Sequence, residues 1–152
     1  MNPYPVRPFA TPDTFFMKTS FQLFIPPLGS RLRLTQEWSF DLHRELRNHD
    51  FREHLGFEDP ADRGRMYLIA QTHPRSDHVV LPAGTVLKVD RIYIRKGQDG
   101  FDSLSFLIES SPDTRLSVCI ITEQGRTRRR QTRFWAKLAD VNDMVVELLQ
   151  EI

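Results

Sequence analysis

A proline and a glycine two positions apart, followed at once by an alternating apolar stretch, occur twice in the chain. PPLGSRLRLTQEW at 26–38 is echoed by LPAGTVLKVDRIY at 81–93. In each copy the proline fixes φ and the glycine supplies a position at φ > 0, which predicts a turn. The apolar residues that follow alternate, as they do in a strand with one buried face. Both copies therefore predict a turn that leads into a strand. Either duplication of a β unit or convergence on a common β solution explains the match.

Further short apolar stretches separated by turn signals predict a mainly β fold. The expected strands, besides those after the two turns, lie at 20–25, 66–71, 101–110, 115–123, 131–138 and 145–152, the last being a strand or a short helix. Strands at this spacing are typical of a β-barrel or a sandwich. Short helices are expected at 11–17 and from Asp50, as N-cap, to a stop at Gly56. Two β subunits, 20–71 and 79–152, are one subdivision of a single domain that spans 1–152.

The second half of the chain resembles SH3-type small barrels in the order of its predicted elements. A long strand, a hairpin, a further strand, the tight turn LADVN and a closing strand follow one another over about residues 80–150. The resemblance implies an SH3-like barrel there. The acidic and aromatic ligand groove of that family is not evident, and a fold alone does not imply a function.

The bulk properties of the chain restrict its class. The chain of 152 residues fits one domain, and its net charge of +1 gives no global attraction to nucleic acid or to an anionic membrane. Prolines at 3, 5, 8 and 12 predict an extended N-terminal arm at 1–12. No apolar stretch approaches the roughly 18 residues of a membrane span. We expect a cytoplasmic protein without membrane contact, and a homo-oligomer is one option.

The residue types that carry catalysis or bind metals form no recognisable motif. The five histidines, at 43, 49, 54, 73 and 78, lie in polar stretches and are interpreted as solvated. The single cysteine, Cys119, is expected in the core. No nucleophile elbow, phosphate loop or dinucleotide fingerprint occurs. We therefore expect no metal and no cofactor. The sequence favours a protein without enzyme activity, and a small hydrolase or transferase is a distant third option.

The stretch EQGRTRRRQTRFW at 123–135 is the first candidate binding site. Strand alternation predicts that Phe134 enters the core and that Trp135 lies on an outer face with the basic side chains, where it is able to stack on a base or to anchor a partner. We expect the arginines before residue 131 at a hairpin tip and the other candidates along its second strand. The predicted partner is nucleic acid first and an acidic protein second. The candidate residues are Arg126, Arg128, Arg129, Arg130, Arg133, Trp135 and Lys137.

A second polar block precedes the first predicted helix after the first repeat. It is either the exposed face of a turn and a short helix or a recognition loop beside the strand that follows the first Pro-x-Gly turn. Its residues are His43, Glu45, Arg47, Asn48, His49 and Asp50. The competing function is a protein–protein adaptor or inhibitor, such as a phage or mobile-element accessory protein, that acts through the proline-rich arm and the edges of the two repeats.

Overall fold

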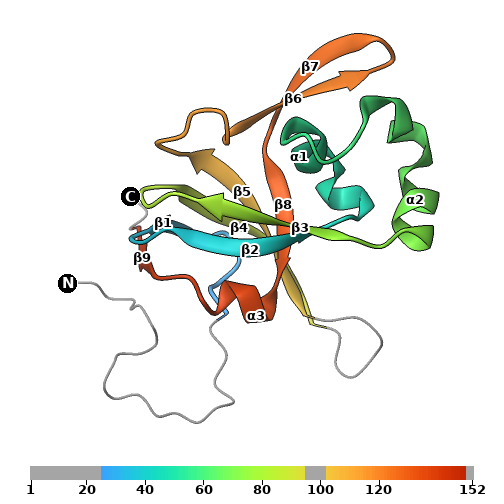
Figure 1. Cartoon of the computed structure of the whole chain (residues 1–152). Helices are drawn as coiled ribbons and strands as arrows, with labels where there is room; N and C mark the ends of the chain where they lie inside the picture. Colours follow the sequence, from blue (N-terminus) through green and yellow to red (C-terminus); the bar gives the residue numbers. More distant parts are fainter. Residues whose placement is uncertain (1–24, 95–101, 150–152) are drawn as a thin grey trace.

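The computed structural model describes residues 25–94 and 102–149 (Figure 1). The predicted arm at 1–12, the helix at 11–17 and most of the strand at 20–25 lie outside the described residues. The strands are β1 (Arg31–Leu34), β2 (Trp38–His43), β3 (Ser76–Leu81), β4 (Val86–Tyr93), β5 (Ser103–Ser110), β6 (Val118–Glu123), β7 (Arg126–Gln131), β8 (Arg133–Lys137) and β9 (Val146–Leu148). The α-helices are α1 (His49–His54), α2 (Met66–Thr72) and α3 (Leu138–Val141), and the 3₁₀ segments are η1 (Leu46–Asn48) and η2 (Pro60–Arg65).

The described strands form three antiparallel sheets. A five-stranded sheet has the order β8-β5-β4-β1-β9, β2 pairs with β3, and β6 pairs with β7. In Figure 1 the β6–β7 hairpin projects from one end of the molecule, and α1 and α2 lie beside it. The mainly β class is therefore confirmed. None of these sheets closes within the described part of the chain, so the barrel and the SH3-like order stay predictions.

The two Pro-x-Gly turns make equivalent hydrogen bonds. The amide of Gly29 donates to the carbonyl of Val89 at 2.9 Å, and the amide of Gly84 donates to the carbonyl of Leu34 at 2.7 Å. Both glycines adopt the positive φ that the turn requires, +84° and +94°. The strands that follow them, β1 and β4, are antiparallel neighbours, so each turn bonds to the strand of the other repeat, at Val89 within β4 and at Leu34 at the end of β1. The turns are structurally equivalent, whereas duplication itself stays a prediction.

One hydrophobic core joins the sheets, and aromatic rings form its centre. Phe134 stacks on Phe40 with 4.9 Å between ring centroids, and Phe40 stacks on Trp38 at 4.4 Å. Phe51 of α1 lies 5.5 Å from Phe134, which brings the helix into the same core. The prediction that Phe134 is buried is confirmed, and so is the burial of Cys119.

The strand predicted at 66–71 is wrong, because this segment is the helix α2. A helical run starts earlier, where the Asp59 side chain accepts a hydrogen bond from the amide of Ala61 at 2.9 Å and Pro60 occupies the first position of η2. Aspartate before proline is a helix-start signal. In α2 only Met66 is buried. A short apolar run is compatible with either a helix or a strand. Here the N-cap at Asp59 starts the helical run that continues into α2.

The helix α1 begins at His49, and Asn48 rather than Asp50 is its N-cap residue. The 3₁₀ segment η1 precedes it directly, so Asp50 lies inside the first turn. The predicted stop at Gly56 is confirmed. Gly56 has φ +89°, and the amide of Phe57 donates to the carbonyl of Arg52 at 2.8 Å, as in a Schellman motif.

The loop of the hairpin is shorter than the one predicted across residues 124–130. Gln124 and Gly125 form its turn, with φ of +54° and +75°, as in a type I′ turn. The arginine run is therefore not a tip loop but the strand β7, which pairs residue by residue with β6. The next strand, β8, pairs with β5 instead.

Candidate anion-binding site

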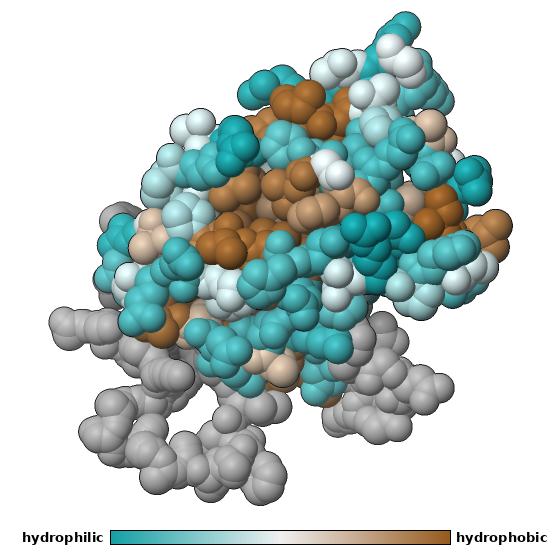
Figure 2. All heavy atoms as spheres, in the orientation of Figure 1, coloured by the Kyte–Doolittle hydropathy of each residue, from teal (hydrophilic) through white to brown (hydrophobic). Residues whose placement is uncertain are grey.

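Three of the four arginines of β7 are exposed and Arg130 is partly buried, and two of the four form ion pairs. Arg128 lies 2.9 Å from the carboxylate of Glu123, and Arg130 lies 3.2 Å from the same oxygen. Arg126 and Arg129 are also exposed, and neither forms an ion pair with any residue that the structure describes. Figure 2 shows a mostly hydrophilic surface over the projecting end of this hairpin.

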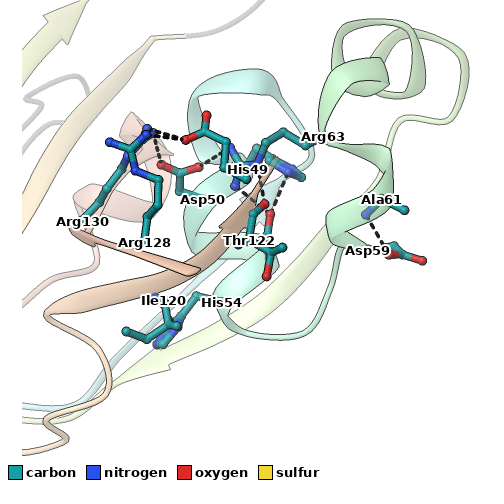
Figure 3. Close-up of polar contacts among 12 residues, drawn as sticks. His49, Asp50, His54, Asp59, Ala61, Arg63, Ile120, Thr122, Arg128 and Arg130 are labelled. Carbon is teal, nitrogen blue, oxygen red and sulfur yellow. Dashed lines mark hydrogen bonds and ion pairs between the residues drawn. The ribbon is translucent and has the colours of Figure 1, made fainter. Parts of the chain in front are cut away.

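The two segments that the sequence indicates separately meet at Asp50. One carboxylate oxygen of Asp50 lies 3.3 Å from Arg130 of β7, and the other lies 3.0 Å from Arg63 of η2. Figure 3 shows the Asp50 carboxylate between these two guanidinium groups. Sequence reasoning missed Arg63 because it lies outside both candidate segments. No local signal distinguishes it from the other arginines.

A pocket of about 310 Å³ opens at this junction. Four arginines and one carboxylate among its lining residues give a formal charge of +4 − 1 = +3. The residues come from η1, α1, η2, β7 and β8, and they are Leu46, Arg47, His49, Asp50, Arg63, Arg130 and Arg133. A second pocket of about 360 Å³ is lined by Arg129, Arg130 and Gln131 together with residues of β5, β6 and the loop before β6.

His49 is buried beside the arginines of the pocket. Its interpretation as a solvated histidine is wrong, because it is 2% exposed. Its Nε2 lies 3.3 Å from a carboxylate oxygen of Glu53, but neither ring nitrogen has a hydrogen-bond partner among the described residues. Burial, followed by the Arg63 guanidinium, lowers the pKa of His49. The imidazole is therefore neutral near pH 7 and presents one N–H donor.

Glu53 fixes the geometry around the pocket. One of its carboxylate oxygens accepts a hydrogen bond from the amide of Thr122 in β6 at 2.7 Å, and the other accepts from Arg63 at 2.7 Å. This side chain is 3% exposed. Charge-assisted bonds of this length hold the hairpin, α1 and η2 together.

Buried ion pairs on the other side of α1 hold the helix against β3. Arg52 is fully buried and donates to Glu58 at 2.7 Å and to Asp77 of β3 at 2.6 Å. A buried charge without such partners would be strongly unfavourable. This network therefore sets the position from which α1 presents His49 and Asp50 to the pocket.

The prediction that Trp135 has an exposed ring is wrong. Its side chain does lie on the face of β8 opposite Phe134, but η1 and the residues before it cover that face, and Trp135 is 4% exposed. Its indole N–H donates to Glu45 at 2.8 Å, and its amide donates to the side chain of Asn48 at 2.8 Å. The ring of His43 stacks on it at 5.3 Å. Three residues of the second polar block thus serve to bury the tryptophan.

The remaining candidates lie around this cover. Arg133 is exposed and lies 3.1 Å from Asp90, and Lys137 is partly buried. Arg47 lies over the rings of Tyr93 and Trp135, at 4.8 and 5.4 Å. Arg47 and Arg133 also line the pocket, whereas Lys137 does not.

The side chains that the structure describes suggest no other chemistry at this place. Within residues 25–94 and 102–149, no group of three or more His, Cys, Asp and Glu side chains is arranged to hold a metal ion. No described helix combines the length and apolar character needed to cross a membrane.

Comparison with known proteins adds no relative. No family model matches the sequence, and neither the curated proteins nor the solved structures contain a significant match to it. The site must therefore be interpreted from its own geometry.

Proposed function

We propose that the protein is a non-catalytic binding module that contacts nucleic acid through the phosphate backbone. The observation that supports this most is the convergence of Arg130 and Arg133 with Arg47 and Arg63 around a pocket that has a single acidic lining residue. Guanidinium groups bind phosphate through paired N–H donors and are the usual choice for this contact. The contact surface extends from the pocket along both faces of the projecting β7 strand, because Arg126 and Arg130 lie on one face and Arg129 on the other.

The ion pairs at this surface limit the expected affinity. Arg128 and Arg130 share Glu123, so a phosphate has to compete with a carboxylate for their donors. Arg126 and Arg129 form no such pair with described residues and are the first phosphate contacts in this proposal. Because Trp135 is buried, its ring is not available to stack on a base. Binding should therefore be weak in sequence preference and driven by backbone charge.

The test is a fluorescence-anisotropy titration with labelled single- and double-stranded oligonucleotides of arbitrary sequence. Binding should weaken as salt rises, and Arg126→Gln or Arg129→Gln should each lower the log–log salt slope by roughly 0.7–0.9. Arg65→Gln is the matched control, since Arg65 is exposed and its ion pair is with Asp62 in the same 3₁₀ segment. If neither oligonucleotide binds even at low salt, nucleic-acid binding is rejected and an acidic protein becomes the first candidate.

A second candidate, a protein–protein adaptor or inhibitor, is favoured by the apolar surface of α2. Tyr67 and Leu68 are 66% and 56% exposed, and Figure 2 shows hydrophobic surface at the edge of the molecule where α2 lies. The repeats do not offer the edges that this function was predicted to use. β1 lies between β4 and β9, and β4 lies between β5 and β1, so neither is an edge strand. The predicted arm lies outside the described residues. A cytoplasmic location stays part of both proposals.

A further inference from the structure

We propose that the pocket between η1, α1, η2, β7 and β8 binds a single phosphomonoester group through Arg47, Arg63, Arg130, Arg133 and His49. The terminal phosphate of a nucleic-acid strand is such a monoester, and free inorganic phosphate presents the same compact set of charged oxygens. The assignment to a strand end rests on the proposed nucleic-acid function, whereas the pocket's preference for phosphate does not. The inference adds to backbone contact a distinct recognition of the more highly charged chain end.

The pocket collects hydrogen-bond donors from distant parts of the chain. The guanidinium groups of Arg47, Arg63, Arg130 and Arg133 come from η1, η2, β7 and β8, four elements that are far apart in the sequence. Each guanidinium carries five N–H donors, and the carboxylates beside it use only some of them. Arg133, for example, reaches Asp90 through Nε at 3.1 Å. The pocket therefore keeps donor capacity that a compact multi-oxygen anion is able to use.

His49 indicates a ligand in the pocket independently of the arginines. Its side chain is almost fully buried and lines the pocket, and neither ring nitrogen has a hydrogen-bond partner among the described residues. Buried polar side chains in folded proteins nearly always have a partner. Here Nε2 has a charged neighbour, the Glu53 carboxylate at 3.3 Å, so Nδ1 is the ring nitrogen that points to a ligand. Both ring nitrogens are themselves buried, so an N–H reaches a phosphate oxygen only when the imidazole turns towards the pocket. A neutral ring then donates one N–H without adding the cost of a buried charge.

A carboxylate of the chain already lies in the pocket at the place where an anion would bind. Asp50 lies between Arg63 at 3.0 Å and Arg130 at 3.3 Å and lines the pocket (Figure 3). An oxyanion is therefore compatible with this position, and a phosphate has to share these two arginines with Asp50. The volume of about 310 Å³ equals roughly ten water molecules at about 30 Å³ each, which leaves room for a phosphate beside the carboxylate.

Asp50 consequently lowers the affinity of the pocket. Asp50→Asn changes the formal charge of the lining from +3 to +4 and keeps an oxygen that accepts from one arginine. One unit charge removed at a few ångströms in a high effective dielectric should tighten phosphate binding about three- to tenfold. Glu37→Gln makes the same charge change at an exposed position in the turn between β1 and β2 and is the matched control.

The first arm of the experiment uses inorganic phosphate and the folded chain. The thermal midpoint of wild type is measured in phosphate and in sodium chloride of equal ionic strength, with circular dichroism to confirm folding. We expect phosphate to raise the midpoint of wild type, to raise it further for Asp50→Asn, and to have a smaller effect on Arg133→Gln. Glu37→Gln and Arg65→Gln should behave as wild type. Arg133 is exposed, so its replacement should not prevent folding.

The second arm compares two oligonucleotides that differ only in a 5′-phosphate or a 5′-hydroxyl. We expect the phosphorylated strand to bind about three- to tenfold more tightly to wild type, by the same charge argument, and this ratio to shrink in Arg133→Gln. A raised midpoint in phosphate, or tighter binding of the phosphorylated strand, supports phosphate binding by the pocket. The first arm tests free phosphate as the ligand, and the second tests the strand end. The pocket is refuted if phosphate and chloride give equal midpoints and both strands bind equally. If no strand binds but phosphate still stabilises the chain, the proposed nucleic-acid function fails while the pocket stands.

Discussion

Replacing Trp135 by alanine should unfold the protein more easily rather than weaken a binding surface. The ring is 4% exposed, and truncating a buried tryptophan to alanine costs about 3–5 kcal/mol. The change also removes the indole N–H that donates to Glu45 at 2.8 Å. A domain has a net stability of only about 5–15 kcal/mol, so a large part of it would be lost.

Trp135→Phe separates the two contributions. Phenylalanine keeps most of the buried ring and its contact with His43, but it loses the hydrogen bond to Glu45. The Glu45 side chain is 36% exposed and regains water, so the cost should be only about 1 kcal/mol. The expected order of stability is wild type, then Trp135→Phe, then Trp135→Ala.

Urea unfolding followed by far-ultraviolet circular dichroism measures this order without relying on tryptophan emission. Val80→Ala on β3 is the control, because Val80 is 46% exposed and a surface change should stay within about 0.5 kcal/mol. The reasoning is refuted if Trp135→Ala is as stable as wild type and instead weakens oligonucleotide binding. That result would place the ring on an open outer face, as strand alternation alone predicts.

Two further predictions concern the turns and the buried thiol. Gly84→Ala should lower the free energy of unfolding in urea more than Gly29→Ala does. Both positions need positive φ, but only the new Cβ at 84 would meet the Pro112 side chain, at 3.0 Å. Equal losses of stability in the two variants would contradict this. Burial raises the pKa of Cys119 to about 11 from 9.0, so the folded thiol should react far more slowly than a free thiol with a disulfide reagent near pH 8, and equal rates would show that it is accessible. The stability from this shift is complete below the unfolded pKa near 9 and is lost as pH rises through the folded pKa near 11, which a pH series of urea midpoints measures.

Local chemistry made several elements predictable from the sequence. The turns at Gly29 and Gly84 follow from steric limits on φ that act within a few residues. The end of α1 at Gly56 follows from the same limits. The strand β5 follows from its alternation and its flanking turns. In each case the determining interactions are close in the sequence.

The elements that were mispredicted depend on weak local signals or on distant partners. Gln124 in the hairpin turn has φ +54°, which asparagine or glycine adopts more readily, so the tight turn was not evident. The cover over Trp135 depends on Glu45 and Asn48, about 90 residues earlier in the chain. Strand alternation states which face a side chain occupies, but not whether another element covers that face.

The candidate site itself shows why residue types alone could not decide its function. In β7, residues 126, 128 and 130 lie on one face of the strand and 127, 129 and 131 on the other. Arg128 and Arg130 on the first face pair with Glu123, and Arg130 also reaches Asp50. The basic cluster is therefore partly neutralised by acids that the sequence places elsewhere. A count of arginines overstates the charge that a partner meets.

This partial neutralisation makes the salt dependence of binding informative about the ion pairs. If only Arg126 and Arg129 meet phosphates, the log–log slope should be roughly 1.4–1.8, from about 0.7–0.9 for each contact. If the pairs with Glu123 and the pair between Arg130 and Asp50 open so that Arg128 and Arg130 also contribute, four contacts give a slope of roughly 2.8–3.6. Glu123→Gln should raise the slope towards the larger value in the first case and leave it unchanged in the second. The measured slope thus reports whether the carboxylates of the chain hold these arginines or give them up to the ligand.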